Sequence, residues 1–252
     1  GLNSPSRYSA IMTRGERVIC VSDTVRAHVL NNWPDTDPAR LRVIPRGIDP
    51  AQFPRGHVAG ADWRVRLHGA HPELAGGRLL LLPGRGTRLK GHADAIRLLA
   101  ALRAEGEDAR LWLLGAAEPG RERYVAELER LALSLGVRAV LAISPPRADV
   151  REAYAEADLV LQLSSRPEAF GRTVVEALAI GRPVLGWDHG GVGELLGALY
   201  PAGAVPVGEH AALAVAARVL LAAPPPVPVT MPHTLAAMQS ATLDLYARLA
   251  SV

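Results

Sequence analysis

The stretch RLLLLPGRGTRLKGHADAIRLLAAL, residues 78–102, joins three patterns in one run. Residues 78–82 are apolar on both faces, which is typical of a strand buried in a parallel sheet. A glycine-rich turn follows, and apolar residues then recur at the spacing of an amphipathic helix: Ala95, Leu98, Leu99 and Leu102. A strand, a glycine turn and a helix N-terminus together present free amide N–H groups to an anion. The stretch therefore predicts an α/β fold with an anion site at the turn.

The same alternation continues along the chain. Four further apolar runs are typical of buried strands: residues 111–114, 139–143, 159–163 and 183–185. Amphipathic helical spacing occupies residues 125–135 and 150–157. We therefore predict a parallel sheet with helices on both faces.

The two ends of the chain differ from this central part. Residues 17–21 and 41–44 are predicted strands, and Ser22 is a predicted helix N-cap, but so few elements cannot close a core alone. Residues 224–232 form a proline-rich connector to a final amphipathic helix, whose apolar stripe is Leu235, Met238, Leu245 and Leu249. The N-terminal elements are therefore expected either to dock on the main domain or to be left over from a missing one.

Composition narrows the choice of partners. The 252 residues carry a net charge of +3 that is spread along the chain, which favours a small anion or an acidic membrane surface over nucleic acid. A single cysteine, Cys20, excludes an internal disulfide and suits a reducing compartment. The longest apolar run, residues 211–223, contains Arg218 and is too short to span a bilayer.

The spacing within the glycine turn excludes two common phosphate motifs. A P-loop needs Ser or Thr after Gly-Lys, but Gly91 follows Lys90. A dinucleotide fingerprint needs its third glycine two residues earlier, so an NAD-dependent dehydrogenase is a distant alternative. Lys90, the only lysine, and Arg85 flank the turn. An ammonium on a flexible stem can meet two phosphate groups, so we predict a diphosphate here, with a stray surface lysine as the plainer alternative.

A second informative stretch is SSRPEAFGRTVVEALAIGRPV, residues 164–184. Glu168 is expected in a loop, and Glu176 two turns into a helix that opens near Phe170 or Gly171. Ionised carboxylates only accept hydrogen bonds and therefore suit vicinal hydroxyl groups. A diphosphate between two hydroxyl-rich ends is a nucleotide sugar. The alternative is a solvated helix glutamate and an acid near a helix cap.

Other motifs carry less weight. Asp35-Thr36-Asp37 is a D-x-D sequence, but it lies between prolines and indicates a capped turn rather than a metal site. His189 and the glycines after it indicate either a cleft mouth or a turn before a helix. The eight histidines have no metal-ligand spacing, so no metal is expected.

The combination of G-R-x(4)-K-G with E-A-F-G-x(4)-E-A resembles the retaining glycosyltransferases of family 4, also called group 1, which have the GT-B fold. Matching pieces run through the chain: RVICVSDTVR, LRVIPRGIDPAQF, LLPGRGTRLKG, LWLLG, REAYAEADLVLQLS and GRPVLGWDHGGVGELL. The resemblance implies a GT-B C-terminal Rossmann-like domain and a small remnant of the N-terminal domain.

The resemblance also implies a role for each site residue. Arg85 and Lys90 would hold the donor diphosphate, Glu168 would contact the donor sugar, and Glu176 would bind the ribose diol. Lys90, Arg85 and Glu168 are thus the expected catalytic residues, and neither a metal nor a cofactor is expected. The remaining implied donor contacts are Gly84, the backbone amides of Phe170, Gly171 and Thr173, and for the base the loop after Ile143.

The implied domains are a tail of the N-terminal acceptor domain with the interdomain linker (residues 1–55), a nucleotide-sugar-binding domain (56–232) and a C-terminal helix packing back on the N-terminal segment (233–252). The missing N-terminal domain is an expected partner, and we expect this truncated chain to bind donor without turnover on its own.

The expected reaction is transfer of a sugar, with retained anomeric configuration, from a nucleotide-diphospho-sugar to a cell-envelope polysaccharide or lipid acceptor, as in lipopolysaccharide biosynthesis. Such a protein is expected in the cytoplasm, at the inner face of the plasma membrane. A sugar-nucleotide epimerase and a non-catalytic nucleotide-binding module are the alternatives.

Overall fold

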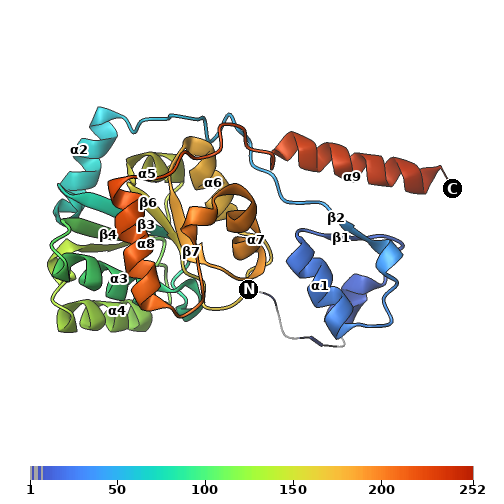
Figure 1. Cartoon of the computed structure of the whole chain (residues 1–252), viewed down its shortest axis with the longest axis horizontal. Helices are drawn as coiled ribbons and strands as arrows, with labels where there is room; N and C mark the ends of the chain where they lie inside the picture. Colours follow the sequence, from blue (N-terminus) through green and yellow to red (C-terminus); the bar gives the residue numbers. More distant parts are fainter. Residues whose placement is uncertain (1, 3–4, 7, 252) are drawn as a thin grey trace.

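A computed structural model describes Leu2, residues 5–6 and residues 8–251. Figure 1 shows a large sheet-and-helix unit and a small N-terminal unit beside it, joined by extended segments. A last helix, α9 (Leu235–Ala250), runs out from the large unit above the small one. Within the described residues no helix combines the length and apolar character needed to cross a bilayer.

The large unit is built on a six-stranded parallel sheet with the order β5-β4-β3-β6-β7-β8. The predicted apolar runs form its first five strands, with ends shifted by no more than two residues. The sixth, β8, is too short to be seen as a pattern. The strands are β3 (Arg78–Pro83), β4 (Ala109–Leu114), β5 (Leu141–Ser144), β6 (Leu159–Gln162), β7 (Val184–Trp187) and β8 (Ala204–Val205).

Helices cover both faces of this sheet, as predicted. In one layer α3 packs against α4 and α8, and in the other α6 packs against α5 and α7. The helices are α2 (Ala61–Ala70), α3 (His92–Ala104), α4 (Glu122–Ser134), α5 (Val150–Glu156), α6 (Arg172–Ile180), α7 (Gly190–Leu199) and α8 (His210–Ala222).

The small unit pairs β1 (Val18–Cys20) with β2 (Leu41–Val43) in parallel, and α1 (Asp23–Asn32) connects them. Its core is a separate small cluster in which Cys20 is fully buried. Ser22 is the N-cap of α1, as predicted, because its hydroxyl accepts a hydrogen bond from the Val25 amide. Leu245 of α9 lines a shallow cavity together with residues 42–44, so α9 lies against β2.

The two segments that connect the units bind each other through their backbones. The Ile48 amide donates to the His233 carbonyl at 3.0 Å, and the Leu235 amide donates to the Ile48 carbonyl at 2.6 Å. A Cβ on Gly47 would lie 2.0 Å from the Thr234 carbonyl oxygen, so only glycine permits this approach. Residues 47–48 and 233–235 therefore form one close backbone contact between the two segments, which we call the joint.

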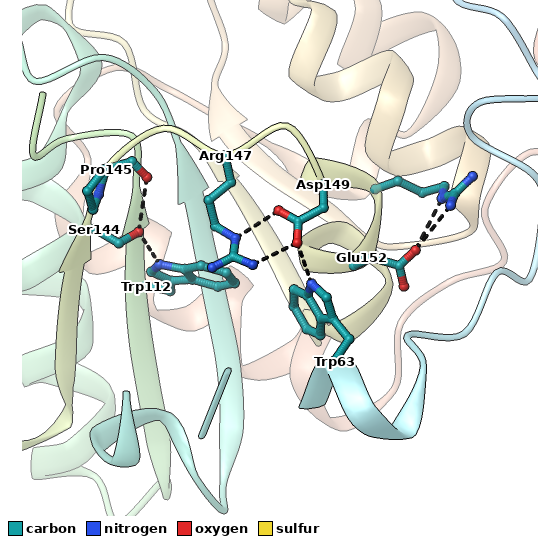
Figure 2. Close-up of polar contacts among 8 residues, drawn as sticks. Trp63, Trp112, Ser144, Pro145, Arg147, Asp149 and Glu152 are labelled. Atoms are coloured by element: carbon teal, nitrogen blue, oxygen red, sulfur yellow. Dashed lines mark hydrogen bonds and ion pairs between the residues drawn. The ribbon is translucent and has the colours of Figure 1, made fainter. Parts of the chain in front are cut away.

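An ion-pair cluster fastens α2 to the loop between β5 and α5 (Figure 2). Trp63 Nε1 donates to Asp149 Oδ2 at 2.6 Å, and Arg147 donates to both Asp149 oxygens at 2.8 and 2.7 Å. The guanidinium also lies 5.7 Å from the Trp63 ring centroid, which adds a cation–π contact. The Arg147 hydrogen bonds, aided by Trp63, lower the pKa of Asp149 to about 2 against the opposing effect of burial.

Replacing Asp149 by Asn should destabilise the protein at neutral pH by about 1 kcal/mol, since the pair is partly exposed and screened. A carboxylate with a depressed pKa stabilises the fold above its unfolded value of about 4, and this stabilisation disappears as pH falls through about 2. The difference in unfolding free energy between wild type and D149N should therefore shrink across pH 4 to 2 in urea titrations. A constant difference across that range, or an equal effect of the exposed control D244N, would contradict the assignment.

Candidate functional site

Two loops meet where the strand order of the large sheet reverses. The chain passes outward from β3 to β4 and β5, and then returns so that β6 lies on the other side of β3. Leu80 is in register with Leu159, and Leu81 with Val160. Because parallel strands end at the same edge, the loops after β3 and β6 lie together there. Ligands of open α/β sheets bind at such a reversal point.

The turn after β3 is pressed against the end of β6. Gly91 has φ +75°, and a Cβ there would lie 1.9 Å from the Leu163 carbonyl oxygen, so no other residue fits. The Gly84 amide donates to the Leu114 carbonyl at 2.8 Å, which ties the start of the turn to β4. Lys90 directly precedes Gly91, so its backbone position is set by this turn. The alkyl stem of its side chain passes close over Gly84.

Lys90 and Glu168 form an ion pair across this edge. Lys90 Nζ lies 2.6 Å from Glu168 Oε1, and the Ser164 hydroxyl donates to the same oxygen. Burial tends to raise the pKa of Glu168, but the hydrogen bonds from Lys90 and Ser164 and the nearby ammonium charge outweigh it, so this pKa is lowered. Glu168 is therefore ionised at neutral pH, and its loop position agrees with the sequence prediction.

The second glutamate, Glu176, is buried in α6. Its carboxylate accepts hydrogen bonds from the Tyr154 hydroxyl and from Arg172 Nη2, both at 2.8 Å. Burial, reinforced by the Glu176 charge, raises the pKa of Tyr154 well above its usual value, so the phenol stays a proton donor. Both oxygens of Glu176 thus have a partner while keeping lone pairs for a further donor.

The predicted start of this helix was wrong by one to two residues. Gly171 is the N-cap, with φ +137°, and α6 begins at Arg172, so Glu176 lies one turn in rather than two. The φ of Gly171 lies outside the range that other residues adopt, and this delays the helix. Among the described residues no side chain caps the N-terminus of α6, so its first amides, including that of Thr173, are available to a ligand.

The other predicted site residues have different surroundings. Arg85 is exposed and makes no ion pair among the described residues. Phe170 is buried, and its ring packs edge-on against His233, with the centroids 5.8 Å apart. Ile143 lies within β5, in register with Leu113, so the loop after it opens at the same edge of the sheet.

Sequence reasoning missed several neighbours of the two glutamates. Ser164 and Tyr154 bind the carboxylates. His189, which the sequence analysis did name, precedes a helix as one of its two alternatives predicted: it is the N-cap of α7, and its Nε2 lies 2.7 Å from the Ser164 carbonyl oxygen. The position of Ser164 four residues before Glu168 is only a weak indication of a contact between them. Tyr154 lies on the apolar stripe of a predicted helix and therefore resembles an ordinary core residue. The structure also buries His92 beside the turn, where Nε2 has no hydrogen-bond partner among the described residues. Burial lowers the pKa of His92 to about 4, so the ring is neutral.

One family model matches most of the chain. The model for glycosyl transferases group 1 matches residues 66–229, which include the glycine-rich turn after β3 and both glutamates. The chain belongs to this family. A D-inositol 3-phosphate glycosyltransferase of Nocardiopsis dassonvillei is 33% identical over 187 residues, which are 72% of this chain and 42% of the relative. The chain therefore spans less than half the length of such curated relatives.

Solved structures give the same fold. A glycosyltransferase from Rickettsia africae superimposes with a TM-score of 0.79 at 20% identity, covering 98% of this chain and 68% of that one. Anabaena Alr3699/HepE, solved in complex with UDP-glucose, has a TM-score of 0.77 at 22% identity, covering 96% of this chain and 66% of that one. The sheet and its flanking helices are thus those of a GT-B C-terminal domain, with β1 and β2 as a small additional sheet.

The arrangement of this group 1 glycosyltransferase domain suits a ligand with both anionic and hydroxyl groups. Lys90 and the amides of the α6 N-terminus can bind negative charge, while Glu168 and Glu176 can accept hydrogen bonds from hydroxyls. Within the described residues, no group of three or more His, Cys, Asp or Glu could hold a metal ion.

Replacing Lys90 by Met should raise the pKa of Glu168 relative to wild type, because the effect of burial is then opposed mainly by the Ser164 hydrogen bond. Carbon-detected NMR titration of the carboxyl groups would measure this. R88M is a matched control, because Arg88 lies in the same turn but pairs with Glu127. Equal titration of Glu168 in K90M and in wild type would contradict the ion pair.

Proposed function

We propose that the protein is the donor-binding half of a retaining glycosyltransferase that uses a nucleotide-diphospho-sugar. The observation that carries the proposal is the Lys90–Glu168 ion pair at the reversal point of the sheet. Glu168 lies in the loop that leads directly into the N-terminus of α6. A cation and free helix amides suit a diphosphate, and a carboxylate beside them suits a sugar hydroxyl.

In this proposal the diphosphate is both the binding handle and the leaving group. Lys90 moves from Glu168 to the phosphates, and Arg85, exposed on the same turn, adds a second cation. The phosphate-binding site is completed by the amides of Gly171 and Thr173 and by the backbone at Gly84 and Phe170. Fixed positive groups aimed at charge that develops on the leaving phosphate lower the barrier to its departure.

The two glutamates orient the ends of the donor. Glu176, held in place by Tyr154 and Arg172, accepts hydrogen bonds from the ribose diol. Glu168, once released by Lys90, accepts hydrogen bonds from the donor sugar near its reacting carbon. The base then extends toward the loop after Ile143. The family resemblance supports retention of configuration through an oxocarbenium-like state, and neither a metal nor another cofactor enters the proposal.

The proposal also covers the acceptor and the place where the protein acts. A cell-envelope polysaccharide or lipid at the inner face of the plasma membrane is the first candidate acceptor. The name of the Nocardiopsis relative makes an inositol phosphate the second. In either case the N-terminal domain, of which the relatives have more than this chain, would supply acceptor contacts, and this chain alone would bind donor without turnover.

Calorimetric titration with UDP-, GDP- and ADP-sugars, in the presence of EDTA, tests donor binding. We expect one nucleotide to bind. K90M should weaken binding of that nucleotide and of its sugar derivative by about 10- to 100-fold, because a charge-assisted hydrogen bond is lost. E168Q should weaken only the sugar derivative, and R88M should change neither. Absence of binding for all three nucleotides, or equal losses in K90M and R88M, would refute the proposal.

Two alternative functions can be distinguished from this proposal by experiment. An epimerase would convert a bound sugar nucleotide without an acceptor, so incubation of the chain with donor alone, followed by chromatographic analysis, would detect an isomer. A non-catalytic nucleotide-binding module would bind the nucleotide equally well with and without its sugar, and E168Q would then have no effect.

A further inference from the structure

The helix that follows β7 reaches across to the small N-terminal unit. Glu194 of α7 accepts hydrogen bonds from the backbone amides of Asp23 and Thr24, at 3.1 and 3.0 Å, and from the Thr24 hydroxyl at 3.1 Å. These amides are the first two of α1, which have no partner within their own helix. One carboxylate thus caps a helix that lies 170 residues earlier in the sequence.

Ser22 completes this cap and extends it to the donor loop. Its hydroxyl accepts from the Val25 amide at 3.1 Å and donates to the Ala169 carbonyl at 2.6 Å. Ala169 lies between Glu168 and Phe170, so the N-terminus of α1 is bonded to the loop that carries the proposed sugar-binding carboxylate. Ser22 is only 2% exposed, which makes this contact well shielded from water.

The same loop is also packed against α7. The Gly191 amide donates to the Glu168 carbonyl at 2.8 Å, and a Cβ on Gly191 would lie 2.5 Å from Phe170 atoms. A side chain on Gly190 would likewise meet Glu168 backbone atoms at 2.8 Å. The start of α7, the loop and the N-terminus of α1 therefore form one contiguous block.

We propose that Glu194 is a positioning residue, which fixes the loop around Glu168 by clamping the N-terminus of α1 against it. It acts through α1 and the Ser22–Ala169 bond and does not touch the donor. The proposal rests on the proposed function for its consequence on donor binding. The clamp itself rests only on the contacts of Glu194 and Ser22.

Hydrogen–deuterium exchange of the 252-residue chain tests the clamp. E194A should speed exchange of the α1 first-turn amides and of the peptide spanning residues 164–171, by about tenfold. S22A should speed exchange of the same loop peptide. E209A is the matched control, because Glu209 is an exposed glutamate that precedes α8 without capping it. If faster exchange in E194A stays confined to α1, Glu194 is a local cap and the proposal is wrong.

A second measurement separates positioning of the loop from general stability. E194A should weaken binding of the sugar nucleotide about threefold more than it weakens binding of the free nucleoside diphosphate, since only the former uses Glu168. Equal losses for both ligands, or none for either, would overturn the positioning role. If wild type binds neither ligand, the proposed function fails, and the exchange experiment still decides whether the clamp exists.

Discussion

The adjacency of β3 and β6 is the constraint on which the site depends. Asp158, just before β6, receives a hydrogen bond from the Leu79 amide at 2.8 Å and an ion pair from Arg78 at 3.0 Å. These contacts hold the two strands in register at their starts, and four leucines of β3, none more than 5% exposed, hold them in the core. Because the register is fixed at one end, the loops at the other end have a fixed separation. Lys90 and Glu168, 78 residues apart, meet for this reason.

The Lys90–Glu168 ion pair compensates the charge of a partly buried carboxylate within the site. A partly buried carboxylate without a partner is costly, and the ammonium of Lys90 removes this cost for Glu168. The stem of Lys90 passes so close to Gly84 that a Cβ there would lie 3.3 Å from its Cγ. A slender alkyl chain fits this space, and its terminal ammonium can rotate between a carboxylate and a phosphate. A planar guanidinium, with its preference for one bidentate partner, suits such an exchange less well.

Sequence patterns predicted the parts of this protein that are set by local physics. Apolar runs correctly predicted the buried strands, and Ser22 was correctly predicted to cap a helix. The pattern was silent on α2, where only Trp63 and Leu67 are buried and no apolar stripe forms. It was also silent on the bonds of Tyr154 and Ser164. The first depends on how α5 packs against α6, and the second depends on how the loop after β6 folds back on itself.

The contacts between the two units differ in kind, and this difference predicts which would yield first. The joint at Ile48 and His233 is made of backbone hydrogen bonds and a glycine that no side chain can replace. The clamp at Glu194 is an exposed carboxylate on helix amides, an interaction that is weak in water and sensitive to salt. Any force that moves the units apart would therefore break the clamp while the joint holds. Since Ala169 is bonded to the clamped helix, such a movement would act on the loop that carries Glu168.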